Sequence, residues 1–80
     1  MVYHSTSDKI RLVLKELRLK NGLTQEGVAT SMGVSKSYIS QVELGKCAIP
    51  KYQFLIKLLE VYRIKPKYFE ELLSKRVEGK

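Results

Sequence analysis

Residues 24–43 read TQEGVATSMGVSKSYISQVE, and this pattern predicts two short helices joined by a tight turn. Gly33 lies between them and permits the positive φ that such a turn needs. Thr24 and Ser35 stand at the two helix starts, where a side-chain oxygen accepts a hydrogen bond from a free backbone amide. Apolar residues at helical spacing can form a shared seam: Val28, Ala29, Val34, Ile39 and Val42. The stretch therefore predicts a helix-turn-helix unit.

Helical spacing of apolar residues continues outside this stretch, and no strand-like alternation is sustained. A first helix is expected to be capped by Ser7 or Asp8 and to end before Asn21-Gly22. A further helix follows Pro50, which suits a first helical turn, and the last helix starts at Pro66. The apolar faces of these helices comprise Ile10, Val13, Leu14 and Leu17, then Phe54, Leu55, Leu58, Leu59 and Tyr62, then Tyr68, Phe69, Leu72 and Leu73.

Together these elements predict an all-α fold, a compact five-helix bundle in which the second and third helices form the helix-turn-helix. Eighty residues suffice for one domain with one modest core. We expect this domain to span residues 8–76, between tails at residues 1–7 and 77–80. Its third helix is expected to end near Leu44, before Gly45.

The third helix is expected to present a polar face to solvent. On a wheel of about 100° per residue, Ile39 and Val42 mark its buried side, and Tyr38 and Glu43 lie at the borders. Glutamine can pair with adenine, lysine with the acceptors of guanine, and serine with several base edges. The outward arc carries no acidic residue and comprises Lys36, Ser37, Ser40, Gln41 and Leu44. This arc is therefore suited to reading the major groove of DNA.

Composition favours a polyanionic partner and gives no sign of catalysis. The net charge of +7 is large for this length, and binding to phosphates releases condensed counterions. The single cysteine, Cys47, cannot form an intrachain disulfide, which fits a cytoplasmic location. No apolar run has the length of a membrane span, so no membrane partner is expected. His4 has no partner at metal-binding spacing, and no catalytic residue, metal site or cofactor is expected.

Several short motifs recur together in this sequence: Leu17-Arg18, Gly22-Leu23-Thr24-Gln25, Val28-Ala29, Gly33-Val34-Ser35, Tyr38-Ile39-Ser40, Glu43-x-Gly45 and the apolar helix after Pro50. With them the chain resembles the lambda-repressor/Cro-like helix-turn-helix family over about residues 8–70. Many relatives have asparagine at the position of Leu44, so the resemblance implies that one polar contact to the DNA backbone is absent in this chain. Gly27, inside the second helix, is expected to cost about 0.5–1 kcal/mol relative to alanine.

The resemblance implies a role for individual residues. Arg18 and Glu43 match a pair that forms a salt bridge between the first and third helices. Phosphate contacts are implied for Gln25, which also braces the residue at Lys36, and for Ser35 and Lys46. Base contacts are implied for Lys36, Ser37 and Gln41, with Ser40 and Tyr38 close enough to take part.

The resulting hypothesis is a regulator of transcription that binds double-stranded DNA by sequence. A lone reading helix covers few base pairs, so a homodimer on a near-palindromic operator is expected. Part of the last helix could supply the dimer contact, through Tyr68, Phe69, Leu72 and Leu73. RNA polymerase or a cognate toxin are further partners that the family suggests. The alternatives are a protein-interaction module on the same scaffold, such as a toxin-neutralising regulator, and a non-specific architectural DNA binder.

Overall fold

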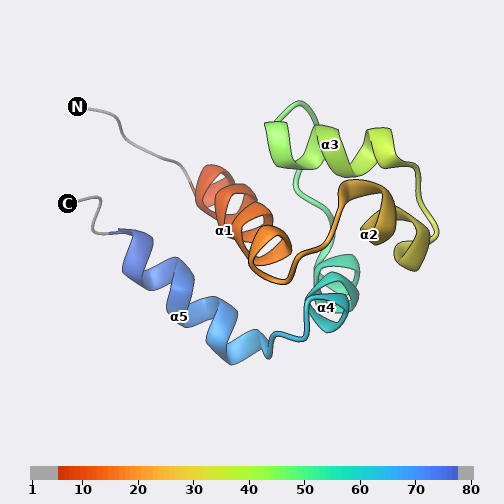
Figure 1. Cartoon of the computed structure of the whole chain (residues 1–80). Coiled ribbons are helices and arrows are strands. Elements are labelled where there is room, and N and C mark those ends of the chain that lie inside the picture. The colour runs from red at the N-terminus through yellow and green to blue at the C-terminus, as the bar shows by residue number, and fades with distance from the viewer. Residues whose placement is uncertain (1–5, 78–80) are drawn as a thin grey trace.

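Five helices make up the regular structure of residues 6–77, the part of the chain that the computed structural model describes (Figure 1). They are α1 (Thr6–Lys20), α2 (Gln25–Met32), α3 (Lys36–Leu44), α4 (Tyr52–Val61) and α5 (Pro66–Val77). The expectation of an all-α five-helix bundle is therefore confirmed. Side chains are described for residues 7–75, and His4 lies outside the described residues.

The helix-turn-helix forms by the local interactions that the sequence predicts. Thr24 Oγ1 accepts a hydrogen bond from the amide of Gly27 at 2.9 Å, and Ser35 Oγ accepts one from the amide of Tyr38 at 3.0 Å. Gly33 ends α2 with a φ of 72°. A Cβ atom at Gly27 would lie 3.1 Å from Thr24 Oγ1, so the cap and the glycine fit each other closely.

The ends of two other helices differ from the expectation. α1 begins at Thr6, so Ser7 and Asp8 lie inside its first turn and neither residue is the cap. α4 begins at Tyr52, and Pro50 precedes it as a buried residue outside the helix. Lys51 is the N-cap residue of α4 and makes no side-chain capping bond there. The helical region thus starts two residues before the expected domain and ends one residue after it.

One apolar core joins all five helices. It contains Val13, Leu14, Leu17, Val28, Ala29, Ile39, Leu58, Leu59, Tyr62 and Phe69. The side chain of Tyr62 is 1% exposed. Its burial, together with the negative charge of Glu43, raises the pKa of the Tyr62 hydroxyl well above the usual value, which the positive charge of Arg18 opposes. The phenol is therefore a neutral part of the core at physiological pH.

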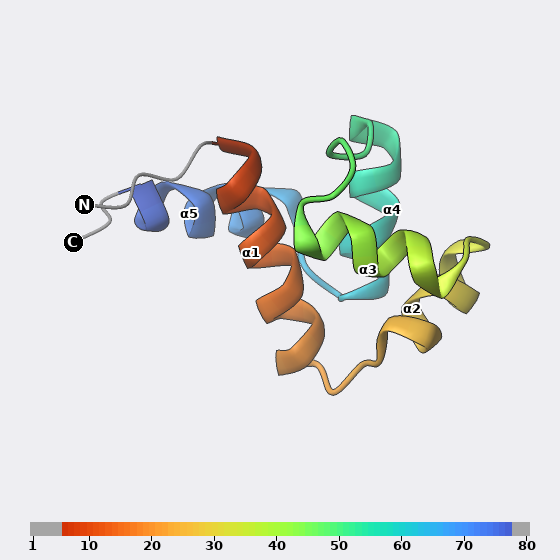
Figure 2. The same ribbon diagram turned by 90° about the horizontal axis from the view of Figure 1, so that it is seen from above.

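Helix α1 lies between α3 and α5 (Figures 1 and 2). It packs against α3 on one side and against α5 on the other, while α2 packs against α3 and α4. Figures 1 and 2 show α3 and α5 separated by α1 in both views. Within residues 6–77, no helix combines the length and the apolar character needed to cross a membrane.

Candidate nucleic-acid interface

The outer face of α3 presents the side chains that the sequence predicts to contact DNA bases. Lys36, Ser37 and Gln41 are exposed, whereas Ile39 and Val42 on the reverse side are each 3% exposed. Gln41 Nε2 donates a hydrogen bond to Ser37 Oγ at 3.3 Å, so these two side chains lie together one turn apart. Their polar groups face solvent and are held there by the burial of the opposite side of the helix.

No acidic side chain is exposed on this helix. Its only carboxylate belongs to Glu43, which is 5% exposed. Ser40 is half-buried, and Leu44 is 58% exposed at the C-terminal end of the same helix. The exposed surface of α3 thus carries one positive charge from Lys36 and no negative charge, an arrangement that suits contact with phosphates.

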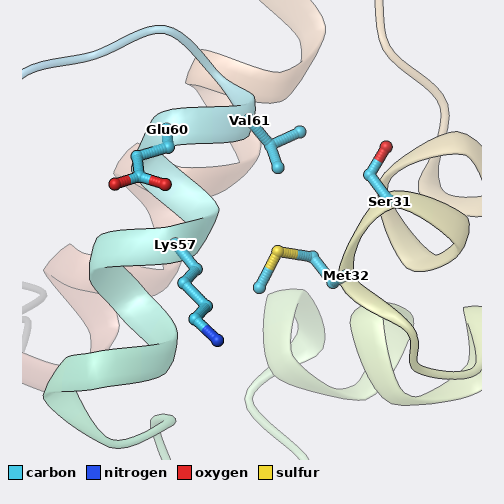
Figure 3. Close-up of a pocket in the computed structure, with 5 residues that line it drawn as sticks. All are labelled: Ser31, Met32, Lys57, Glu60 and Val61. Atoms are coloured by element: carbon cyan, nitrogen blue, oxygen red, sulfur yellow. The ribbon is translucent and has the colours of Figure 1, made fainter.

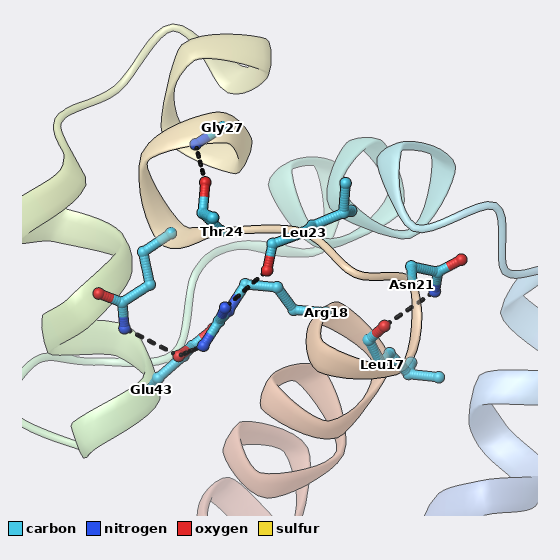
Figure 4. Close-up of polar contacts among 8 residues, drawn as sticks. Leu17, Arg18, Asn21, Leu23, Thr24, Gly27 and Glu43 are labelled. Atoms are coloured by element: carbon cyan, nitrogen blue, oxygen red, sulfur yellow. Dashed lines mark hydrogen bonds and ion pairs between the residues drawn. The ribbon is translucent and has the colours of Figure 1, made fainter.

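The buried carboxylate of Glu43 is held by two residues from other elements (Figure 4). Arg18 of α1 donates from Nε to Glu43 Oε2 at 2.7 Å and from Nη2 to Glu43 Oε1 at 3.0 Å. Arg18 Nη1 also donates to the carbonyl oxygen of Leu23 at 2.8 Å. The hydrogen bonding of Arg18 to the Glu43 carboxylate raises the pKa of Arg18 above its usual value, against the effect of burial. The structure therefore places the expected Arg18–Glu43 pair in direct contact, with both partners buried.

Gln25 belongs to the same buried cluster, a contact that the sequence did not indicate. Its Nε2 atom donates to Glu43 Oε1 at 3.0 Å, and the residue is half-buried. The resemblance assigns Gln25 to a phosphate and to the residue at Lys36. In the structure its amide nitrogen instead links the start of α2 to α3.

Tyr38, at the border of the outward arc, packs against another helix. Its ring meets the ring of Phe54 edge-on, with centroids 5.7 Å apart and an interplanar angle of 89°. Burial raises the pKa of the Tyr38 hydroxyl, and a negative charge on Cys47 would raise it further. Tyr38 therefore anchors the first turn of α3 on α4.

Two phosphate candidates flank α3. Ser35 is exposed, and because its Oγ accepts the capping bond its O–H remains able to donate to a ligand. Lys46 is exposed immediately after Gly45. One candidate therefore lies at each end of α3.

The residues expected at a dimer contact do not form one exposed face. Tyr68 is 43% exposed, and Leu72 and Leu73 are half-buried. Phe69 is only 6% exposed because it fills the core, so its inclusion among the surface contacts is corrected. Beside it, an apolar hollow of about 190 Å³ opens between α4 and α5, lined by Tyr52, Leu55, Ile56, Leu59, Pro66, Phe69, Glu70 and Leu73. Tyr52 at its rim is 71% exposed.

A second, more open hollow of about 390 Å³ lies between α2 and α4 (Figure 3). It contains none of the expected site residues and is lined by Ser31, Met32, Lys57, Glu60 and Val61. Among the residues that the structure describes, no three His, Cys, Asp or Glu side chains are grouped so that they could hold a metal ion. The polar face of α3 is therefore the surface whose chemistry points to a ligand.

A family model described as helix-turn-helix matches residues 14–69. The wild-type restriction-modification controller protein C.Esp1396I has a similar structure, with a TM-score of 0.84 and 26% sequence identity over 92% of this chain and 94% of that chain. The same protein as a tetramer in complex with its natural 35 base-pair operator gives a TM-score of 0.82 and 26% identity, over 92% and 96% of the two chains. A search of curated proteins gives no match.

Proposed function

This chain belongs to the lambda-repressor/Cro-like helix-turn-helix family, and from that membership we propose that it binds double-stranded DNA by sequence and thereby regulates transcription. The observation that carries the proposal is the exposed face of α3, where Lys36, Ser37 and Gln41 point to solvent without an acidic neighbour on the helix surface. A face one helix wide fits the major groove. We infer that the chain acts in the cytoplasm and by binding, without catalysis.

In this proposal the three exposed side chains contact base edges. The amide of Gln41 can donate and accept at adenine, and the ammonium group of Lys36 can donate to the acceptors of guanine. Ser40 and Tyr38 are proposed to contact bases or backbone. Phosphate contacts from Ser35 and Lys46, with a smaller part for Gln25, fix the register of the helix on the duplex. The net charge of +7 supports this electrostatic component.

The operator is expected to contain two half-sites. The controller protein similar to this chain was crystallised on its operator as a tetramer. Two copies of α3 spaced by about 34 Å would meet successive major grooves on one face of the duplex. A two-fold symmetric dimer of this chain would therefore select a near-palindromic sequence.

The substitution Gln41→Ala is expected to weaken binding to the preferred duplex by about 1–3 kcal/mol and to relax the preference at one base pair. The reason is the loss of a bidentate contact to one base. The preferred duplex is obtained by selection from random double-stranded DNA with the wild-type chain, and binding is measured on it and on a scrambled duplex. Lys46→Ala is the contrast, because loss of a phosphate contact weakens binding to both duplexes and lowers the salt slope by about one. Equal losses on both duplexes for Gln41→Ala would contradict base reading.

The substitution Tyr68→Lys is expected to raise the dissociation constant of the dimer about tenfold or more, since an exposed tyrosine at a dimer contact contributes much of the binding energy. Tyr68, Leu72 and Leu73 are the proposed contact, beside the hollow between α4 and α5. Sedimentation at micromolar concentration measures self-association. Ser74→Lys is the control, because this residue is exposed on the same helix and the change adds the same charge. If the wild-type chain is a monomer at this concentration and binds a duplex with two half-sites without forming a dimer, the proposed dimer is refuted.

A further inference from the structure

The C-terminal end of α3 is closed by two backbone hydrogen bonds, which satisfy the carbonyl groups of Gln41 and Val42 but not that of Glu43. The amide of Lys46 donates to the carbonyl of Gln41 at 2.9 Å, and that of Gly45 donates to the carbonyl of Val42 at 3.2 Å. Gly45 has a φ of 77°, as this type of helix end requires. The carbonyl oxygens of the last turn have no partner within the helix itself. The next carbonyl, that of Glu43, therefore needs a donor from elsewhere.

Arg11 of α1 supplies that donor. Its Nη1 atom donates to the carbonyl oxygen of Glu43 at 3.2 Å, across 32 residues of sequence. Figures 1 and 2 show the end of α3 beside α1. The other arm of the guanidinium, Nη2, forms an ion pair with Asp8 Oδ1 at 2.6 Å. Because the guanidinium is planar, the contact with Asp8 fixes the direction of the arm that reaches α3.

The glycine at the helix end also fits against this arginine. A Cβ atom on Gly45 would lie 2.8 Å from Arg11 Nε and 3.2 Å from its Cδ. The arginine stem thus passes so close to Gly45 that a side chain there would displace it. Glycine at position 45 therefore allows both the positive φ of the helix end and the close approach of Arg11.

Two arginines of α1 therefore hold the same residue of α3. Arg11 binds the main chain of Glu43, and Arg18, two helical turns further along α1, binds its carboxylate. The residues on either side of Glu43 include Gln41 and Lys46, a proposed base reader and a proposed phosphate contact. We propose that Arg11 is a positioning residue for DNA recognition, which sets the direction of the end of α3 without itself contacting DNA. This inference rests on the proposed function.

The first test compares Arg11→Met with Lys15→Met. Both changes remove one positive charge from α1, and Lys15 is exposed. We expect Arg11→Met to weaken binding to the selected duplex about tenfold, because hydrogen bonds to a charged group contribute about this factor. Binding to the scrambled duplex should fall no more than in Lys15→Met, and the salt slopes of the two variants should be equal. A loss that is equal on both duplexes, with a slope lower by about one, would assign Arg11 to a phosphate and overturn the proposal.

The substitution Arg11→Lys tests whether the geometry of the guanidinium group matters or only its positive charge. It keeps the net charge, but a single ammonium group cannot reproduce the fork between Asp8 and Glu43. We expect Arg11→Lys to lose most of the same sequence discrimination. Wild-type discrimination in Arg11→Lys would overturn the proposal. This variant also keeps the test valid if Arg11→Met folds poorly.

Hydrogen exchange in the free chain tests the positioning without DNA. The amide of Lys46, bonded to the carbonyl of Gln41, should exchange about tenfold faster in Arg11→Met than in Lys15→Met, while amides in the middle of α1 keep their rates. Unchanged exchange at Lys46 would overturn the proposal. If the wild-type chain instead shows no preference among duplexes while exchange responds as expected, the proposed function fails and the structural role of Arg11 stands.

Discussion

Replacing Glu43 by alanine is expected to lower the free energy of unfolding by about 3–5 kcal/mol, because it leaves a buried positive charge without its partner. Arg18 is 7% exposed and donates two hydrogen bonds to this carboxylate. Gln25 donates a third, so the substitution removes the acceptor of three N–H groups. A domain of this size has a total stability of about 5–15 kcal/mol, and the variant should be partly unfolded at elevated temperature. Urea unfolding at low temperature measures the change as a shift of the midpoint at constant slope.

Two further variants show whether the loss comes from the ion pair. Glu43→Gln keeps an acceptor of similar shape and should lose less than Glu43→Ala. The double change Arg18→Met with Glu43→Leu removes both charges, and apolar pairs of similar volume replace buried ion pairs at little cost. It should therefore be more stable than Glu43→Ala alone. A loss below about 1 kcal/mol in Glu43→Ala, as is typical of exposed pairs, would contradict a structural role for the buried pair.

The local signals in the sequence predict the helix-turn-helix well because each one acts over a few residues. Thr24 and Ser35 cap helices, and Gly33 and Gly45 end them, through bonds that reach no further than five positions along the chain. The apolar spacing of α3 likewise orients its outer face without knowledge of the rest of the fold. Lys36, Ser37 and Gln41 were therefore assignable to an exposed surface from the sequence.

Contacts between distant segments could not be predicted in this way. A glutamate is seldom buried, and the helical wheel places Glu43 only at a border, yet its side chain lies in the interior. Only the family resemblance paired it with Arg18. Nothing in the sequence links Arg11 to α3, since the contact depends on how α1 crosses the end of that helix.

Residue type was also a poor guide at two positions near the C-terminus. Tyr68 and Phe69 are adjacent aromatic residues, but one is 43% exposed and the other 6%. Which of them faces the core depends on the rotation of α5 against α1. Arg63 adopts a φ of 59° at the end of α4, where the amide of Ile64 donates to the carbonyl of Leu59. This hydrogen bond is the one found where a glycine ends a helix, but here the residue with positive φ is an arginine. The sequence therefore carries no signal for this helix end.

The double change Lys36→Ala with Gln41→Ala is expected to lower the preference for the selected duplex over the scrambled one by about 2–6 kcal/mol, if each side chain contributes its own base contact. Both side chains are exposed, so thermal unfolding and self-association should stay as in the wild type. The chain offers a matched control in Gln53→Ala with Lys57→Ala, the same residue types in exposed positions on α4. Fluorescence anisotropy on both duplexes, at one fixed salt concentration, measures the difference.

The pattern of losses in this double variant separates the proposed function from its rivals. A module that docks to a protein predicts that the α3 variant keeps its activity, because its partner need not contact the polar face of α3. An architectural binder predicts that the α3 variant loses the same affinity for both duplexes. The loss should equal that of the control variant, which also lacks one positive charge. Only a helix that reads bases loses affinity for one duplex and retains the weak, salt-dependent affinity for the other, since the phosphate contacts proposed for Ser35 and Lys46 would be left in place.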